Sequence, residues 1–527
     1  MRRSVCQWLP PALLAQAWLA PAAAAHGFAQ RYDLPVPLPL YLAGAAAAVA
    51  LSFVVMVVFI RGRHAVERYP RFDLLSIAPG RGLARLAPLL RLIGVAGLAL
   101  VIAAGLIGDP NPFRNLAPTL VWVIWWVGLA YVSGLAADLW SLVNPWTTVY
   151  ETLGRLARRV RPAASPLPHF RYPRRFGHWP AVLLFAGFVW AELVWPSSDT
   201  PASLACAAAG YSLVTWAGML AFGKHTWLRH GEAFTVAFGL LARFAPTEYR
   251  NADRDVCAQC GAAFCGPAAR DCINCAQCFE RSGTAARELN LRPFAVGLLV
   301  DRPVPFSLMV FTVVMLSSVT FDGLLATPLW SDVAKAMLYS ETLRPLLLVF
   351  QDITGDAVSA VATIALLVFL ALFQLVWLVF GVLIWLFTPA AARAGVTPRQ
   401  VACLFVFSLV PIALAYHLAH YLSYLLIVGQ YMIPLASDPF GLGWDLFGTR
   451  HYLVNIGIVN ARFVWIASVI AIVAGHVVAV FLAHVMALRV FRNDRAALLS
   501  QIPMLAAMLA YTMLSLWILA QPIVETG

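Results

Sequence analysis

The sequence has too few charged residues for a soluble globular protein. Only 12% of its 527 residues are charged, whereas 61% are hydrophobic and the mean hydropathy is +0.77. A folded soluble domain needs more polar surface than this to face water. The composition therefore excludes an ordinary soluble globule and indicates a polytopic membrane protein.

The chain also lacks the short motifs that identify common hydrolase and nucleotide sites. It has no Gly-x-Ser-x-Gly elbow, His-Glu-x-x-His pair, phosphate loop or dinucleotide fingerprint. Lysine occurs only as Lys224 and Lys335, so arginine carries nearly all of the basic charge. The formal net charge is +12, but the arginines concentrate in loops between hydrophobic runs, as membrane orientation requires. We therefore expect a lipid bilayer, and not nucleic acid, as the partner.

Residues 1–25 predict a cleavable secretory signal. Two arginines follow the initial Met, an apolar stretch spans residues 9–20, and three alanines precede His26. Cleavage there would make His26 the mature N-terminus outside the cytoplasm, where its amine and imidazole could chelate Cu(II). The alternative is an uncleaved first anchor.

Ten further apolar runs are long enough to cross about 30 Å of hydrocarbon. They cover residues 38–60, 88–107, 117–137, 179–197, 202–222, 303–325, 357–388, 401–434, 461–488 and 502–521. Arginine-rich loops alternate with short, nearly uncharged ones, so the arginine-rich loops are placed inside and both ends of the mature chain outside. The sequence predicts an all-α helix bundle in a bacterial inner membrane. Its membrane regions, 26–222 and 302–527, would flank a cytoplasmic segment, 223–301.

That segment contains six of the nine cysteines, at Cys257, Cys260, Cys265, Cys272, Cys275 and Cys278. Thiols are kept reduced in the cytoplasm, so metal binding is favoured over disulfides. Two Cys-x2-Cys pairs could close a four-thiolate zinc site. An iron-sulfur cluster is the alternative, although the Cys-Pro of the bacterial ferredoxin run is absent after Cys278. A structural knuckle and a redox cluster both remain open.

Two stretches beside the inside loops predict amphipathic helices. Residues 230–245 carry apolar side chains at helical spacing and predict a helix that lies along the membrane face. Residues 139–160 have a similar pattern, which Pro145 interrupts and an arginine-rich end follows.

Four histidines lie within two neighbouring spans. His417 and His420 are one turn apart on the eighth span, and His476 and His484 are two turns apart on the ninth. Counting inward from the outer ends of the two spans places His420 opposite Ala474, which would bring His476 level with the first pair and put His484 about 12 Å deeper.

Ionisable groups at membrane depth are costly and usually face a cavity or a partner. Three imidazoles can hold zinc, copper or iron with an open position, and two on facing helices can hold a haem. The alternative is that these histidines form hydrogen bonds between helices and bind nothing.

Several other polar side chains lie near the ends of spans. Glu192 is deeper than Asp138 and Asp322 and is therefore a functional candidate, whereas solvation at the interface is expected for the two aspartates. Three tyrosines near the histidines could donate hydrogen bonds to metal ligands, but ordinary interfacial aromatics are expected: Tyr416, Tyr421 and Tyr424.

Short motifs spread over most of the chain resemble a known family. They are Ala25-His26-Gly27, Arg31-Tyr32-Asp33-Leu34-Pro35-Val36-Pro37, Gly108-Asp109-Pro110-Asn111-Pro112, Ala117-Pro118-Thr119, Asn144-Pro145-Trp146 and Gly231-Glu232-Ala233-Phe234. Together they are similar to bacterial membrane proteins identified as fenitrothion hydrolases. The resemblance implies hydrolysis of an organophosphorus triester by a membrane-bound, two-subunit enzyme. It assigns no catalytic residues.

Two functions follow from these patterns. A metal-bound hydroxide held by His417, His420 and His476 could attack phosphorus in a small apolar substrate that reaches the site from the bilayer. Alternatively, the chain could transfer electrons or handle metals, with a cytoplasmic cysteine cluster and an intramembrane haem or copper.

Overall fold

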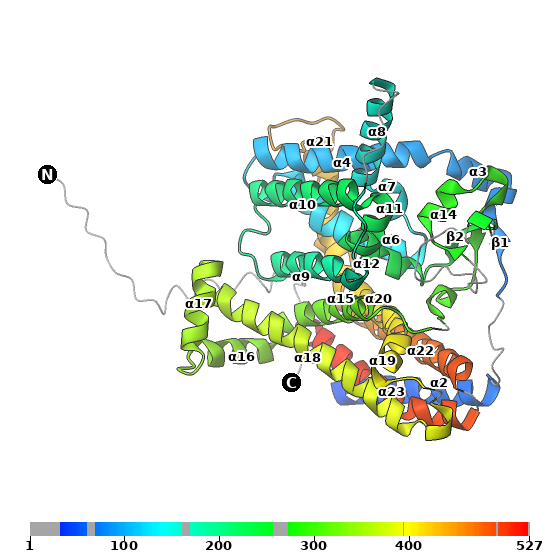
Figure 1. The fold of residues 1–527 in the computed structure, drawn as a ribbon. Helices are drawn as coiled ribbons and strands as arrows, with labels where there is room; N and C mark the ends of the chain where they lie inside the picture. The colour runs from blue at the N-terminus through cyan, green and yellow to red at the C-terminus, as the bar shows by residue number, and fades with distance from the viewer. Residues whose placement is uncertain are drawn as a thin grey trace.

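Ten helices form a membrane bundle in the computed structural model, which describes residues 32–60, 69–160, 169–253, 255–256, 272–300, 302–393, 395–491 and 494–524. Each is long and apolar enough to span a bilayer. They are α2 (Leu38–Phe59), α4 (Ala87–Ile107), the composite span Leu116–Leu135, the span Arg174–Leu193 that contains α9 (Trp179–Leu193), α10 (Pro201–Phe222), α15 (Phe306–Leu325), α18 (Ala357–Phe387), the composite span Pro398–Ser437, α22 (Ala461–Val490) and α23 (Asp494–Ile523). The predicted all-α bundle with ten spans is confirmed (Figure 1).

Two of the spans are built from consecutive segments. The third consists of α5 (Leu116–Pro118), the π-helix η3 (Thr119–Gly128) and α6 (Leu129–Leu135). The eighth consists of α19 (Pro398–Phe405), η8 (Val406–Leu409), α20 (Val410–Ile427), η9 (Val428–Tyr431) and α21 (Met432–Ser437). Pro411 at the start of α20 has no N–H to donate to the preceding turn, which accounts for the break at η8.

Many large apolar side chains on these helices remain exposed. Leu51, Leu183, Val368 and Ile470 are each at least 60% exposed. A soluble protein does not leave such extended apolar surfaces in water, whereas lipid covers them at no cost. The chain is therefore a multi-pass membrane protein.

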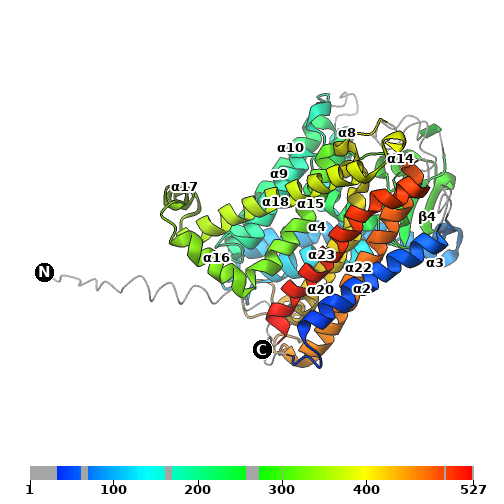
Figure 2. The same cartoon turned by 90° about the horizontal axis from the view of Figure 1, so that it is seen from below.

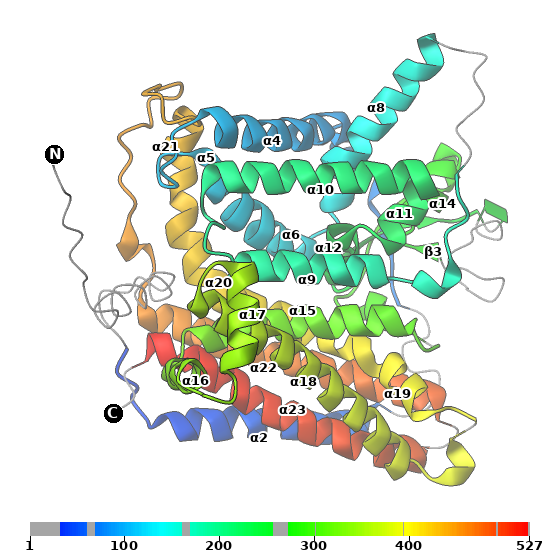
Figure 3. The same cartoon turned by 60° about the vertical axis from the view of Figure 1, so that its left-hand side comes forward.

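The helices of the bundle end at two opposite sides of the molecule, which we call the terminal face and the sheet face. The described ends meet at the terminal face, where the amide of Tyr32 donates to the carbonyl oxygen of Ile523 at 3.0 Å. Figure 2 shows α2, α22 and α23 side by side along the bundle. Figure 3 shows the start of α2 and the end of α23 on one side of the molecule and the small sheet on the opposite side. Residues Tyr32 and Ile523 and the small sheet thus lie at opposite faces.

The sheet at the second face has four antiparallel strands in the order β1-β4-β2-β3. They are β1 (Phe72–Asp73), β2 (Thr247–Asn251), β3 (Cys272–Ile273) and β4 (Arg287–Leu291). The sequence pattern did not reveal this sheet, because its strands are short and come from two loops far apart in the chain. The residues after α2 therefore pack with the cysteine segment.

Shorter helices connect these parts. At the sheet face they are α3 (Ala78–Ala84), α7 (Trp140–Val143), α8 (Pro145–Val160), α11 (Lys224–His230), α12 (Ala233–Ala242) and α14 (Ala276–Arg281). The helix predicted over 139–160 is confirmed, with its break before Pro145. At the terminal face, α16 (Pro328–Leu338) and α17 (Arg344–Thr354) join α15 to α18.

The prediction that residues 230–245 lie along the membrane face is wrong. Eight of the ten residues of α12 are buried, and the helix packs against α6, α9, α15 and α20 inside the bundle. The sequence showed an apolar stripe but not that the opposite side, with its small residues Thr235, Gly239 and Ala242, could also be largely covered.

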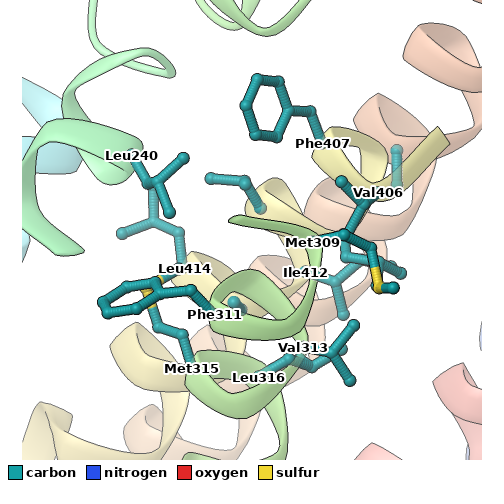
Figure 4. Packing of buried hydrophobic residues seen from close by; sticks show 14 of the residues in the cluster. Leu240, Met309, Phe311, Val313, Met315, Leu316, Val406, Phe407, Ile412 and Leu414 are labelled. Carbon is teal, nitrogen blue, oxygen red and sulfur yellow. The ribbon is translucent and has the colours of Figure 1, made fainter. Parts of the chain in front are cut away.

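The composite eighth span lies at the centre of the bundle. In its most apolar stretch 94% of the residues are buried, against 17% in α2. Figure 4 shows Leu240 of α12, Phe311 and Met315 of α15 and Leu414 of α20 pointing towards one another. Contacts of this kind make α20 the helix around which the others pack.

Candidate intramembrane site

Polar side chains of α20 gather at the middle of this apolar core. His417 and His420 are 5% and 6% exposed, and Tyr421 is also buried. Because residues three and four apart share one face of a helix, the three side chains project to the same side of α20. Burial in a bundle of this composition requires that their polar atoms find partners or face a cavity.

Tyr421 connects both histidines to two carboxylates. Its ring centroid is 4.7 Å from that of His417 and 4.7 Å from that of His420. Its hydroxyl donates to Asp322 Oδ2 at 2.5 Å and to Glu192 Oε1 at 3.4 Å. We call these five residues the acid–imidazole cluster.

The cluster draws its carboxylates from two further helices. Asp322 is three residues from the end of α15, and Glu192 is one residue from the end of α9, so both approach from the terminal face. His420 Nε2 donates to Asp322 Oδ2 at 2.9 Å. The side chain of Asp322 is 22% exposed against 5% for His420, so the cluster opens on its carboxylate side.

His417 lies on the apolar side of the cluster. Its ring contacts Trp126 and Tyr131 at centroid distances of 5.8 and 6.0 Å, and the backbone of Val127 forms a hydrogen bond with it. Val127 belongs to the π-helix η3, a backbone form that frequently occurs at functional sites. Nε2 of His417 is buried and has no hydrogen-bond partner among the residues that the structure describes.

A small cavity adjoins His417. Its volume is about 20 Å³, enough for one water molecule. It is lined by Trp126, Ala130, Ala237, Phe238, Leu241, Met315, Val319, Ala413 and His417. Apart from His417 and the indole of Trp126, the side chains that line the cavity are apolar. The imidazole of His417 is therefore the basic group at this cavity.

The predicted convergence of three imidazoles is wrong. Ser468 donates to the carbonyl of Ala419 at 3.3 Å, which places His420 level with Ser468 and about six residues from Ala474. The count inward assumed that both spans start at the same height. The eighth span instead continues to Ser437 and extends beyond the start of α22, so α22 is displaced by roughly 9 Å along its axis.

His476 and His484 consequently have other surroundings. His476 Nδ1 donates to the carbonyl of Ile472 at 2.8 Å, and its ring lies 5.9 Å from that of Tyr511. His484 lies between Gln501 Oε1, 2.9 Å from its Nδ1, and the carbonyl oxygen of Ile60, 3.0 Å from its Nε2. The contact of His484 with Gln501 is a hydrogen bond between helices, as in the alternative interpretation, whereas His476 bonds within its own helix.

Among the described residues, no three His, Cys, Asp or Glu side chains are placed to hold one metal ion. This statement does not extend to most of the cysteine segment, because Cys257, Cys260 and Cys265 lie outside the described residues. Cys272 begins β3, Cys275 Sγ lies 3.7 Å from Arg229 Nη2, and Cys278 is 1% exposed.

The signal peptide and His26 also lie outside the described residues. Glu192, chosen from its depth, does belong to the cluster. Asp322 and Tyr421 do not have the solvated interfacial roles expected for them. The sequence did contain one signal for their role. Asp322 and Tyr421 fall in the same half of their spans, α15 and α20, as the histidine pair.

No family model, no curated protein and no solved structure matches the chain.

Proposed function

We propose that this membrane protein is a hydrolase of apolar phosphorus triesters, with His417 as its general base. The observation that supports the proposal is the buried Nε2 of His417, which no described residue hydrogen-bonds, beside a cavity with room for one water molecule. The resemblance to fenitrothion hydrolases supplies the substrate class. An apolar aryl triester would also concentrate in the bilayer in which this site lies.

The reaction needs one proton acceptor and one water molecule. The bond of the His417 ring to the Val127 backbone uses Nδ1, because Nε2 has no partner, and this leaves the lone pair of Nε2 available. Nε2 takes a proton from water while the water oxygen bonds to phosphorus and the phosphorus–aryloxide bond breaks. The aryloxide leaves, and the proton passes from the imidazolium to solvent. A dialkyl phosphorothioate and a phenol are the products.

The other members of the acid–imidazole cluster act as positioning residues. Asp322 holds His420 and the Tyr421 hydroxyl, and the Tyr421 ring packs against His417. A base held in one orientation loses little entropy as the reaction proceeds. The exposed side of Asp322 offers the substrate a path from the terminal face.

The test uses the full chain in detergent micelles and a dialkyl aryl phosphorothioate that releases a nitrophenolate. We expect His417→Gln to lower kcat about 10²–10⁴-fold with little change in KM, the usual range for loss of a general base. His451→Gln, on an exposed loop at the terminal face, is the matched control. Equal kcat values for the two variants would refute the assignment.

Substitutions at Tyr421 separate positioning from catalysis. Tyr421→Phe keeps the ring that contacts His417 but removes the hydroxyl between Asp322 and Glu192. We therefore expect Tyr421→Phe to retain more activity than Tyr421→Ala. If wild-type protein of native fold releases no nitrophenolate at all, hydrolysis of this substrate class is excluded.

A further inference from the structure

A second pocket lies at the sheet face, far from the acid–imidazole cluster. Its volume is about 410 Å³, within the range of small-ligand sites. It is lined by Arg91, Tyr150, Glu151, Gly154, Arg155, Arg158, Lys224 and Glu280. Four cationic and two anionic side chains give this pocket a net formal charge of +2.

The two carboxylates are already matched within the pocket. Lys224 Nζ lies 2.6 Å from Glu151 Oε1 and 2.8 Å from Glu280 Oε2, and its side chain is only 12% exposed. Arg91 lies 3.5 Å from Glu151 Oε2. The excess positive charge therefore rests on the two arginines of α8.

Arg155 and Arg158 share one face of α8 with Gly154. A Cβ atom at Gly154 would lie 3.7 Å from Arg158 Nη1, so the guanidinium lies across this glycine and the pocket stays open. Within the described part of the chain, the polar contacts of Arg155 are with Glu151 and Thr152 of its own helix. Guanidinium groups in this arrangement suit a phosphate, to which they can donate pairs of hydrogen bonds.

The surroundings of the pocket match a lipid ligand. In the same two turns of α4 as Arg91, Leu89 and Leu92 are 53% and 62% exposed. On the face of α8 turned away from the pocket, Leu153 and Leu156 are 59% and 55% exposed. A helix of this kind lies at the level of the headgroups, with its apolar side towards the acyl chains.

We propose that this pocket binds the phosphate group of an anionic phospholipid. Basic clusters on an amphipathic helix beside a spanning helix are a recognised form of site for anionic lipids. The phosphate would lie between Arg155 and Arg158, and the acyl chains would follow the exposed leucines of α4. The proposal is independent of the hydrolase function.

Native mass spectrometry of the full chain in detergent tests this site with phosphatidylglycerol, phosphatidylcholine and glycerol 3-phosphate as probes. We expect preferential binding of phosphatidylglycerol, weakened about 30-fold in Arg155→Gln/Arg158→Gln, at roughly fivefold for each arginine removed. Arg159→Gln/Arg171→Gln removes the same charge from exposed positions outside the pocket and should bind as wild type does.

A second variant tests the cavity without changing charge. Gly154→Leu favours the helix but fills the space under Arg158, and it should also weaken phosphatidylglycerol binding. Equal binding by the two double variants would overturn the site. Equal binding of phosphatidylcholine, or full displacement of lipid by glycerol 3-phosphate, would overturn the identification of an anionic lipid as the ligand.

Discussion

Glu248 is the residue on which the sheet depends most, and its replacement gives the sharpest prediction about the fold. Its carboxylate lies 2.7 Å from Arg292 Nη1 and 2.7 Å from Arg71 Nε. The side chains of Glu248 and Arg292 are both 0% exposed. One carboxylate thus connects the residue before β1, strand β2 and the residue after β4.

The expected cost follows from this burial. Glu248→Ala leaves the guanidinium of Arg292 buried without its counter-ion, and removing one member of a buried pair costs about 3–5 kcal/mol. Arg71 is 20% exposed and can be solvated by water, so it adds little. Opening of the sheet should become more frequent by a factor between about 100 and about 4,000.

Amide hydrogen exchange of β2 and β4 measures this opening directly. The matched control is Glu288→Ala in β4, because Glu288 pairs with Arg250 at a partly exposed position, 28% and 24% exposed. A surface pair of this kind contributes at most about 1 kcal/mol, or roughly a fivefold change. Exchange rates in Glu248→Ala within fivefold of those in Glu288→Ala would refute the reasoning.

Two further predictions concern the same face of the molecule. Burial raises the pKa of Glu280, but hydrogen bonds from His225 and Lys224 and the charge of Lys224 together lower it to about 2. This pKa is lower in the folded protein than in the unfolded chain. Glu280→Gln should therefore lower the melting temperature by its full amount above pH 4.5, and by less and less as the pH falls towards 2. A difference in melting temperature that stays the same at every pH would contradict this. The cysteine segment should carry zinc or an iron-sulfur cluster, and elemental analysis together with the absorption spectrum distinguishes the two. The variant Cys275→Ser/Cys278→Ser should lose the metal. The control Cys206→Ser, in α10, should keep it.

The spans could be predicted from the sequence because each is a local property of composition. A run of about 20 apolar residues has few alternatives to a spanning helix, and the predicted limits of the first span, 38–60, differ from α2 by one residue. The largest difference is at the last span, which begins at Asp494 and not at residue 502. The first two turns of this helix contain Asp494, Arg495, Ser500 and Gln501, and their low hydropathy hid its true start.

The site could be predicted only in part, because it depends on relative heights of helices from distant parts of the chain. The pairing of His417 with His420 follows from helical spacing alone. The contact of His420 with Asp322 requires that α15 and α20 be aligned, and a shift of one turn would separate them. The same dependence explains the wrong placement of His476. The prediction assumed that the eighth and ninth spans begin at the same height, and this displaced α22 by about two turns along its axis.

The sheet and the intramembrane cavity are parts of one packed unit through α12. Arg292 donates to the carbonyl of Arg243 at 3.0 Å and to that of Ala242 at 3.4 Å, at the end of this helix. One turn and two turns earlier, Phe238 and Phe234 pack on Trp126, whose ring contacts His417. Glu248→Ala should therefore loosen the hold of Arg292 on the end of α12, the helix that forms one wall of the cavity. We expect the rate of hydrolysis to fall together with the protection of the β2 and β4 amides against hydrogen exchange. If the sheet opens and hydrolysis is unchanged, the burial of α12 alone holds that wall, and Glu248 acts only at the sheet face.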